Sequence, residues 1–191
     1  MREGGNGWAA TTKCQKQWQK AFQRLIRDPD HITFPVSDLA SPQTKNIMTP
    51  EIIRLGQIEI RFLLEGKDTN GQLAAFEFTV PAGAKVPIPH SHERYDETIY
   101  GLEGMMTFTV NGKPTDIAAG ETCFIPRGAV HGFNNLKPAN AKALAVVTPA
   151  LIGPDYFREM AAIVNAGGPP DLEKLKAVMT RHGLVPAPPR K

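Results

Sequence analysis

Between residues 50 and 150, hydrophobic and polar positions alternate in short runs that are separated by turn-forming residues. A period of two is typical of β-strands with one buried face, and short strands at close spacing indicate a sandwich or barrel. The pattern predicts strands at residues 57–64, 73–80, 98–101, 105–110, 122–125, 132–134 and 143–147. Asn111-Gly112 follows one of these runs and predicts a tight hairpin into a further extended stretch.

From residue 154 the hydrophobic period changes to about 3.6, which indicates amphipathic helices. The apolar face of the first helix consists of Tyr156, Phe157, Met160, Ile163 and Val164. This helix begins near Pro154 and ends at Gly167-Gly168, and Asp171 is the expected N-cap of a second helix that stops at Gly183. We therefore expect a helical hairpin packed against the β-rich domain. His182, in the last turn, is expected to act as a favourable helix C-terminal charge.

The chain of 191 residues suits a single ordinary domain with an extension. Residues 48–150 are expected to form the barrel, and residues 151–191 the helical hairpin. Residues 1–47 contain glycine and proline breakers around a segment in which Trp18 and Phe22 share one helical face. This extension is either a disordered arm or a single helix. A natural start at Met48 is the alternative.

Composition narrows the possible partners. Hydrophobic residues make up 41% and charged residues 21% of the chain, which is typical of a soluble globular protein. Neither a membrane span nor a secretory signal stands out, so we expect a cytoplasmic protein with no membrane partner. Residues 1–47 hold seven basic and four acidic residues, which accounts for the whole net charge of +3. The neutral remainder predicts no nucleic-acid partner. Cys14 and Cys123 are expected to be free thiols.

The chemistry-bearing residues lie in two segments. His90 and His92 stand two positions apart on an extended stretch, so their imidazoles point into the same space. Glu97 follows after a short bend and can bring a carboxylate to the same point. About forty residues later, glycine and proline turns flank a short strand that aims His131 back across the barrel. Three imidazoles and one carboxylate predict a site for one divalent metal ion.

These segments read HxHx4Ex6G and Gx5PxGx2Hx3N, the paired motif that the cupin superfamily carries. The chain resembles that superfamily over residues 50–150, with Gly83 standing one position further upstream than usual. The resemblance implies an all-β fold, a double-stranded β-helix or jelly roll, with a C-terminal helical hairpin. It also implies that His90, His92, Glu97 and His131 bind the metal.

Four protein ligands leave two positions of a six-coordinate ion open, which favours catalysis over a structural role. The donor set suits Fe, Mn, Ni, Co or Zn and does not select one of them. The chain resembles the quercetin 2,3-dioxygenase-like group, which implies a dioxygenase acting on a small enolic or aromatic substrate. Glu97 would be both ligand and proton acceptor, and Phe78, Met106 and Phe133 would line the substrate pocket.

Two other functions stay open. The first is a non-redox metal-dependent isomerase, cyclase or lyase that acts on a sugar or a small keto acid. A sugar phosphate would need a basic cluster, for which only Arg61, Arg94 and Arg127 are candidates. The second is a cupin that binds a small ligand without turnover. In each case we expect a small-molecule partner and a homodimer, since pairing would cover exposed strand edges.

Overall fold

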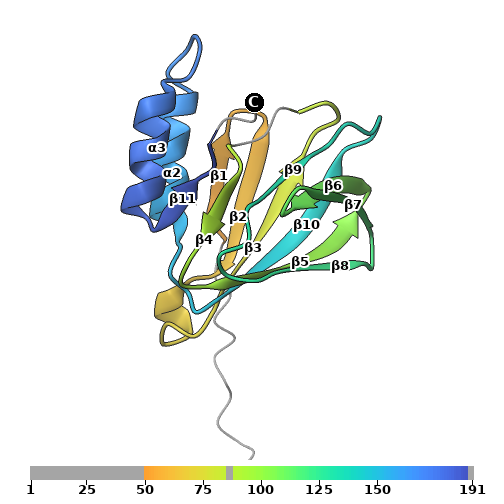
Figure 1. Cartoon of the computed structure of the whole chain (residues 1–191), viewed down its shortest axis with the longest axis horizontal. Coiled ribbons are helices and arrows are strands. Elements are labelled where there is room, and N and C mark those ends of the chain that lie inside the picture. The colour runs from red at the N-terminus through yellow and green to blue at the C-terminus, as the bar shows by residue number, and fades with distance from the viewer. Residues whose placement is uncertain (1–49, 85–87, 189–191) are drawn as a thin grey trace, which may run out of the picture. The chain divides into compact units, whose positions relative to one another are not determined.

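A computed structural model describes residues 50–84 and 88–188 (Figure 1). The predictions for residues 1–47 lie outside the described residues and stay predictions. The described residues belong to one unit, Met48–Lys191. In this part of the chain, no helix is long and apolar enough to cross a membrane.

Two antiparallel sheets form the β-rich part of this unit. The six-stranded sheet has the order β1 (Ile52–Leu55), β2 (Ile58–Leu64), β3 (Ala74–Val80), β10 (Ala141–Thr148), β5 (Asp96–Glu103) and β8 (Thr122–Ile125). The five-stranded sheet has the order β11 (Leu184–Pro186), β4 (His90–His92), β9 (His131–Asn134), β6 (Met105–Val110) and β7 (Lys113–Ala118). A short 3-10 helix, η3 (Gly66–Asp68), lies between β2 and β3. The predicted jelly roll is confirmed.

The alternation seen in the sequence places one face of each strand in the core between the sheets. In β10, Ala141, Ala143, Ala145 and Val147 are buried, while the residues between them are partly exposed. Phe78 of β3 packs against Phe108 of β6, with ring centroids 6.4 Å apart. Aromatic side chains from the two sheets therefore meet in the core, as expected for sheets that pack face to face.

Helices α2 (Pro154–Val164) and α3 (Leu172–Arg181) lie beside β1 and β11 (Figure 1). The Asp171 side chain accepts hydrogen bonds from the backbone N–H groups of Glu173 and Lys174, so the predicted N-cap is confirmed. Phe157 of α2 meets Phe76 of β3 at a centroid distance of 5.2 Å. The helical hairpin thus shares the core of the sheets. His182 is the C-cap and pairs with Glu159.

The chain then turns at Gly183, which has φ +79°, and forms β11. This strand was not predicted. It pairs with β4, with Leu184 opposite His92 and Pro186 opposite His90. The C-terminal segment therefore supports the strand that carries two candidate metal ligands.

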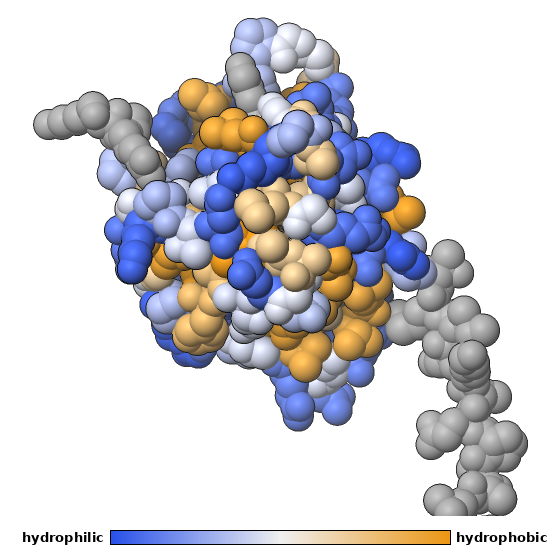
Figure 2. Space-filling model, turned by 90° about the vertical axis from the view of Figure 1, so that its right-hand side faces the viewer, coloured by the Kyte–Doolittle hydropathy of each residue, from blue (hydrophilic) through white to orange (hydrophobic). Residues whose placement is uncertain are grey.

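The outer strand edges differ in character. Four residues of β7, beginning with Lys113 and Pro114, are exposed. A proline and charged side chains limit the pairing of such an edge with another chain. On β8, Phe124 keeps 60% of its surface exposed. From the side on which β7 and β8 lie, hydrophobic patches alternate with polar residues (Figure 2). The homodimer stays a prediction.

Candidate metal centre and cavity

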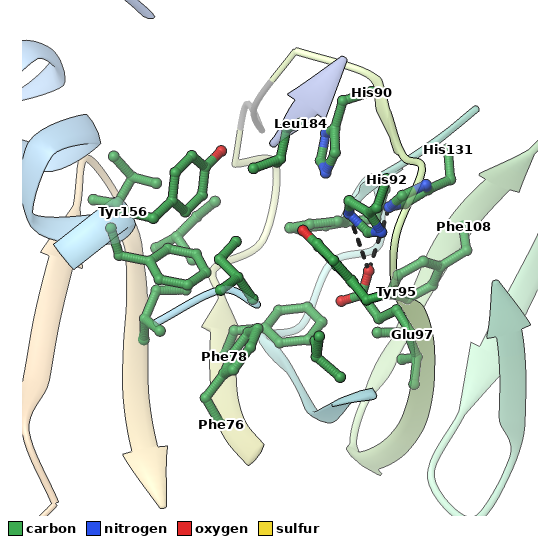
Figure 3. Close-up of a pocket in the computed structure, with 18 residues that line it drawn as sticks. Phe76, Phe78, His90, His92, Tyr95, Glu97, Phe108, His131, Tyr156 and Leu184 are labelled. Carbon is green, nitrogen blue, oxygen red and sulfur yellow. Dashed lines mark ion pairs between the residues drawn. The ribbon is translucent and has the colours of Figure 1, made fainter. Parts of the chain in front are cut away.

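Three histidines converge inside the barrel. His90 and His92 lie on β4, and His131 lies on β9, where it is the register partner of His90. One ligand atom from each residue lies within 4.8 Å of the others. The three side chains gather at one end of a cavity (Figure 3). Three residues from two sequence motifs that lie far apart in the chain are thus brought together and can form a metal site.

Backbone carbonyls orient two of these imidazoles. The Nδ1 of His90 lies 3.0 Å from the Ile88 carbonyl oxygen, and the Nδ1 of His131 lies 3.0 Å from the Ala129 carbonyl oxygen. A carbonyl oxygen only accepts hydrogen bonds, so each Nδ1 carries a proton, and the Nε2 presents a lone pair whenever the imidazole is neutral. A histidine that binds a metal is commonly fixed in this way. The contacts therefore fit a metal site. The buried Nδ1 of His92 has no partner among the described residues.

Glu97 brings a carboxylate to the same point from the opposite sheet. It lies on β5, between Ile125 of β8 and Val147 of β10. Its Oε2 is 3.3 Å from the His131 Nε2 and 3.8 Å from the His92 Nε2 (Figure 3). Among the described residues its ion pairs involve only these histidines. No lysine or arginine neutralises it there, so the carboxylate is available to a cation.

Burial sets the charge state of the cluster. Desolvation lowers the pKa of His90 to about 4 and the pKa of His92 to about 3, so both are neutral at pH 7. Burial also acts on His131, but its hydrogen bond to Glu97 raises its pKa above the ordinary value. Burial alone would raise the pKa of Glu97, yet the imidazoles hold it below its usual range. Glu97 is therefore a carboxylate at pH 7, and at least two imidazoles are in the form that binds metals.

The cavity that adjoins the cluster is apolar. Its volume is about 80 Å³, which admits a small ligand and is below the usual range of drug-sized pockets. Hydrophobic side chains form most of its wall: Leu55, Ile58, Ile60, Phe76, Phe78, Ile99, Phe108, Phe133, Val147, Ile152, Phe157 and Leu184. The other lining residues are His90, His92, Tyr95, Glu97, His131 and Tyr156. Among the residues that the structure describes, no lysine or arginine lines this cavity.

Of the three residues expected to bind the substrate, two line the cavity and one does not. Phe78 and Phe133 line the cavity with ring centroids 5.1 Å apart. Met106 is buried but does not line the cavity, where Phe108 takes the place expected of it. Both belong to the inward face of β6, and Met106 lies two residues nearer the start of that strand. Alternation predicts the face that a side chain occupies, but not its depth along the barrel.

Most of the lining residues were not predicted as site residues, and Tyr95, Tyr156 and Leu184 are the informative cases. Tyr95 stands between His92 and Glu97, so its position inside the first motif was an available signal. Tyr156 was predicted only as part of a helix face. Leu184 belongs to a strand that the sequence pattern does not indicate.

The family model described as "Cupin domain" matches residues 76–147. The chain is 31% identical over 100 residues to quercetin 2,3-dioxygenase of Bacillus subtilis (strain 168), covering 52% of this chain but only 29% of that protein. It is 32% identical over 93 residues to the oxalate-binding protein of Thermotoga maritima, covering 48% of this chain and 76% of that protein.

Solved structures also match part of the chain. A predicted oxalate decarboxylase from Thermotoga maritima matches with 30% identity and a TM-score of 0.49, over 54% of this chain and 94% of that one. KdgF from Halomonas sp. matches with 22% identity and a TM-score of 0.46, over 52% of this chain and 86% of that one.

Proposed function

The chain belongs to the cupin family, and on that premise we propose that it is a metal-dependent dioxygenase acting on a small enolic or aromatic substrate. One observation carries the proposal. Three imidazoles and a carboxylate converge at the end of a cavity whose other lining residues are hydrophobic apart from two tyrosines. Such a cavity suits a flat, largely apolar molecule with few oxygens.

His90, His92, Glu97 and His131 would hold one divalent ion, and Fe, Mn, Co, Ni or Zn suits this donor set. When bound, the ion would supply Lewis-acid chemistry and, if it is Fe or Mn, the means to use dioxygen. The Ile88 and Ala129 carbonyl oxygens accept hydrogen bonds from two of these imidazoles and so fix their orientation.

Glu97 is the group that would take a proton from the substrate. Burial raises its pKa but the neighbouring imidazoles outweigh this and hold the pKa below the ordinary value, so Glu97 is ionised at pH 7 and has no proton of its own to lose first. Phe78 and Phe133 would flank the substrate ring, and the hydrophobic wall would exclude water from the reaction. The small cavity volume favours a single-ring or open-chain substrate over a polycyclic one.

A non-redox reaction on a sugar phosphate is less well supported. Arg61, Arg94 and Arg127 are absent from the cavity wall, and Arg127 is bound to Asp96 by a 2.6 Å ion pair. Binding without turnover stays a second candidate, since a 32% identical relative is named an oxalate-binding protein. A small-molecule partner without nucleic acid or membrane contacts agrees with either function.

Glu97→Gln tests the assignment. At saturating metal we expect the variant to keep most of its metal, since an amide oxygen still coordinates, and to lose about 10²- to 10⁴-fold in kcat. Oxygen consumption with small diketones and catechols is the assay, and elemental analysis gives the metal content. Glu93→Gln is the matched control, because Glu93 is exposed in the same segment. Absence of oxygen consumption by the wild type with either Fe or Mn would refute the dioxygenase.

A further inference from the structure

Tyr95 carries a buried hydroxyl group without a partner. It lies between β4 and β5, its side chain is only 2% exposed, and it lines the cavity beside the candidate metal centre. Its hydroxyl oxygen makes no hydrogen bond to any of the described residues. Figure 3 shows this hydroxyl pointing into the cavity from the side of the histidines. A phenol that is buried usually finds a hydrogen-bond partner.

The ring of Tyr95 is held in place by its neighbour. It stacks on the His92 imidazole with a centroid distance of 4.1 Å and an interplanar angle of 20°. A phenylalanine would make the same stack on His92. It would also avoid the loss of stability that comes from burying a hydroxyl without a hydrogen-bond partner. Within the described residues, the hydroxyl therefore contributes nothing to the fold that the ring does not. A molecule in the cavity that Tyr95 lines can supply the partner that the described residues do not.

The phenol acts as a donor in this environment. A phenol has an ordinary pKa of about 10 and therefore carries its proton at pH 7, so this hydroxyl can donate a hydrogen bond to an acceptor in the cavity. Tyr95 stacks on His92 and lines the same cavity as Glu97 and the imidazoles, so a ligand held at the cluster can also meet the phenol.

We propose that the Tyr95 hydroxyl donates a hydrogen bond to a second oxygen of the substrate, next to the oxygen that binds at the histidine and glutamate cluster. The proposal rests on the proposed function and narrows its substrate class. The substrate carries two oxygens on neighbouring carbons, as a catechol, an ene-diol or an α-hydroxyenone does, on an otherwise apolar skeleton. Tyr95 is then a substrate-binding residue that selects such compounds over those with one oxygen.

The test compares Tyr95→Phe with the wild type by calorimetric titration of the zinc-loaded protein without oxygen. Catechol is the two-oxygen probe and phenol the one-oxygen probe. We expect the variant to bind catechol about 10-fold more weakly, which is the loss of one good hydrogen bond, and to bind phenol within twofold of the wild type. Tyr100→Phe, on the exposed face of β5, is the matched control and should change neither affinity.

Thermal unfolding of the metal-free protein supplies a second readout that does not depend on turnover. Because Tyr95→Phe removes an unpaired buried hydroxyl and keeps the stack on His92, its melting temperature should equal or exceed that of the wild type. An unchanged affinity for catechol would overturn the proposal. A clear drop in melting temperature would overturn it too, because it would mean that the protein or a buried water already satisfies the hydroxyl. Failure of the wild type to prefer catechol over phenol would overturn it too.

These readouts separate the inference from the function it rests on. If the iron- and manganese-loaded wild type consumes no oxygen but Tyr95→Phe still discriminates catechol from phenol, the dioxygenase fails and the role of Tyr95 stands. If oxygen is consumed and the variant binds both probes as the wild type does, the function stands and the role of Tyr95 fails.

Discussion

Acidification tests whether the imidazoles of the candidate metal centre are as desolvated as their positions indicate. A metal binds neutral histidine, so protons compete with it wherever an imidazole titrates. His90 and His92 have pKa values of about 4 and about 3, and both stay neutral at pH 5. His131 is different, because its hydrogen bond to Glu97 raises its pKa. Between pH 7 and pH 5, His131 should therefore be the main imidazole that competes.

The size of the effect follows from these values. For an imidazole with an ordinary pKa of about 6.5, the neutral fraction falls about 25-fold between pH 7 and pH 5. Three such imidazoles titrating independently would therefore weaken metal binding by about 10⁴-fold. With His131 alone, the loss is limited to about 10²-fold, or tenfold for each pH unit. Accordingly, metal binding near pH 6 should release about one proton rather than two or three.

Competition with a chelator of known affinity at pH 7, 6 and 5 measures this loss, and calorimetry in buffers of different ionisation enthalpy counts the protons. Glu97→Gln is the informative variant, because it removes the group that raises the pKa of His131 and should flatten the pH dependence while lowering affinity overall. A loss of 10³-fold or more in the wild type, or release of two or more protons, would show that His90 and His92 ionise as they do in solvent and would refute the reasoning.

Three further outcomes are expected. His131→Ala should leave little bound metal after purification, as elemental analysis will show, and full occupancy would contradict the assignment. Gly101→Ala should lower the free energy of unfolding by about 3 kcal/mol or more in denaturant unfolding, because the new Cβ would lie 2.0 Å from the Ala118 carbonyl oxygen. The control is Gly132→Ala, which should lower the free energy of unfolding far less, because its Cβ would meet nothing closer than 3.5 Å. Deleting residues 1–47 should keep folding and metal content, and a melting temperature more than about 10 °C lower would make the extension structural.

The two segments that form the histidine cluster could be predicted because short-range geometry determines each of them. His90 and His92 share a side of β4 through the period of two, and the turns that flank β9 bring His131 opposite them. The helices followed from a period of 3.6 and from the capping side chain of Asp171. In each case the residues that determine the structure lie within a few positions of one another.

The parts that could not be predicted depend on contacts between distant segments. β11 has three residues, ends on Pro186, and is a strand because β4 offers it an edge. No alternation can be read in so short a run. The unpaired hydroxyl of Tyr95 is likewise a tertiary property, since the sequence shows a tyrosine in the motif but not whether its oxygen finds a partner.

Part of the cavity wall lies inside the segment that matches the family model and part lies outside it, which limits what the relatives can tell about the substrate. The family match covers residues 76–147, which include all four candidate ligands and Tyr95. Tyr156 of α2 and Leu184 of β11 also line the cavity, and both lie after that match. The candidate ligands thus lie within the matched segment, whereas part of the wall that sets the size of the substrate lies outside it. The search for the substrate should therefore start from this chain's own small apolar cavity and from its polar lining residues, which are the histidine and glutamate cluster, Tyr95 and Tyr156.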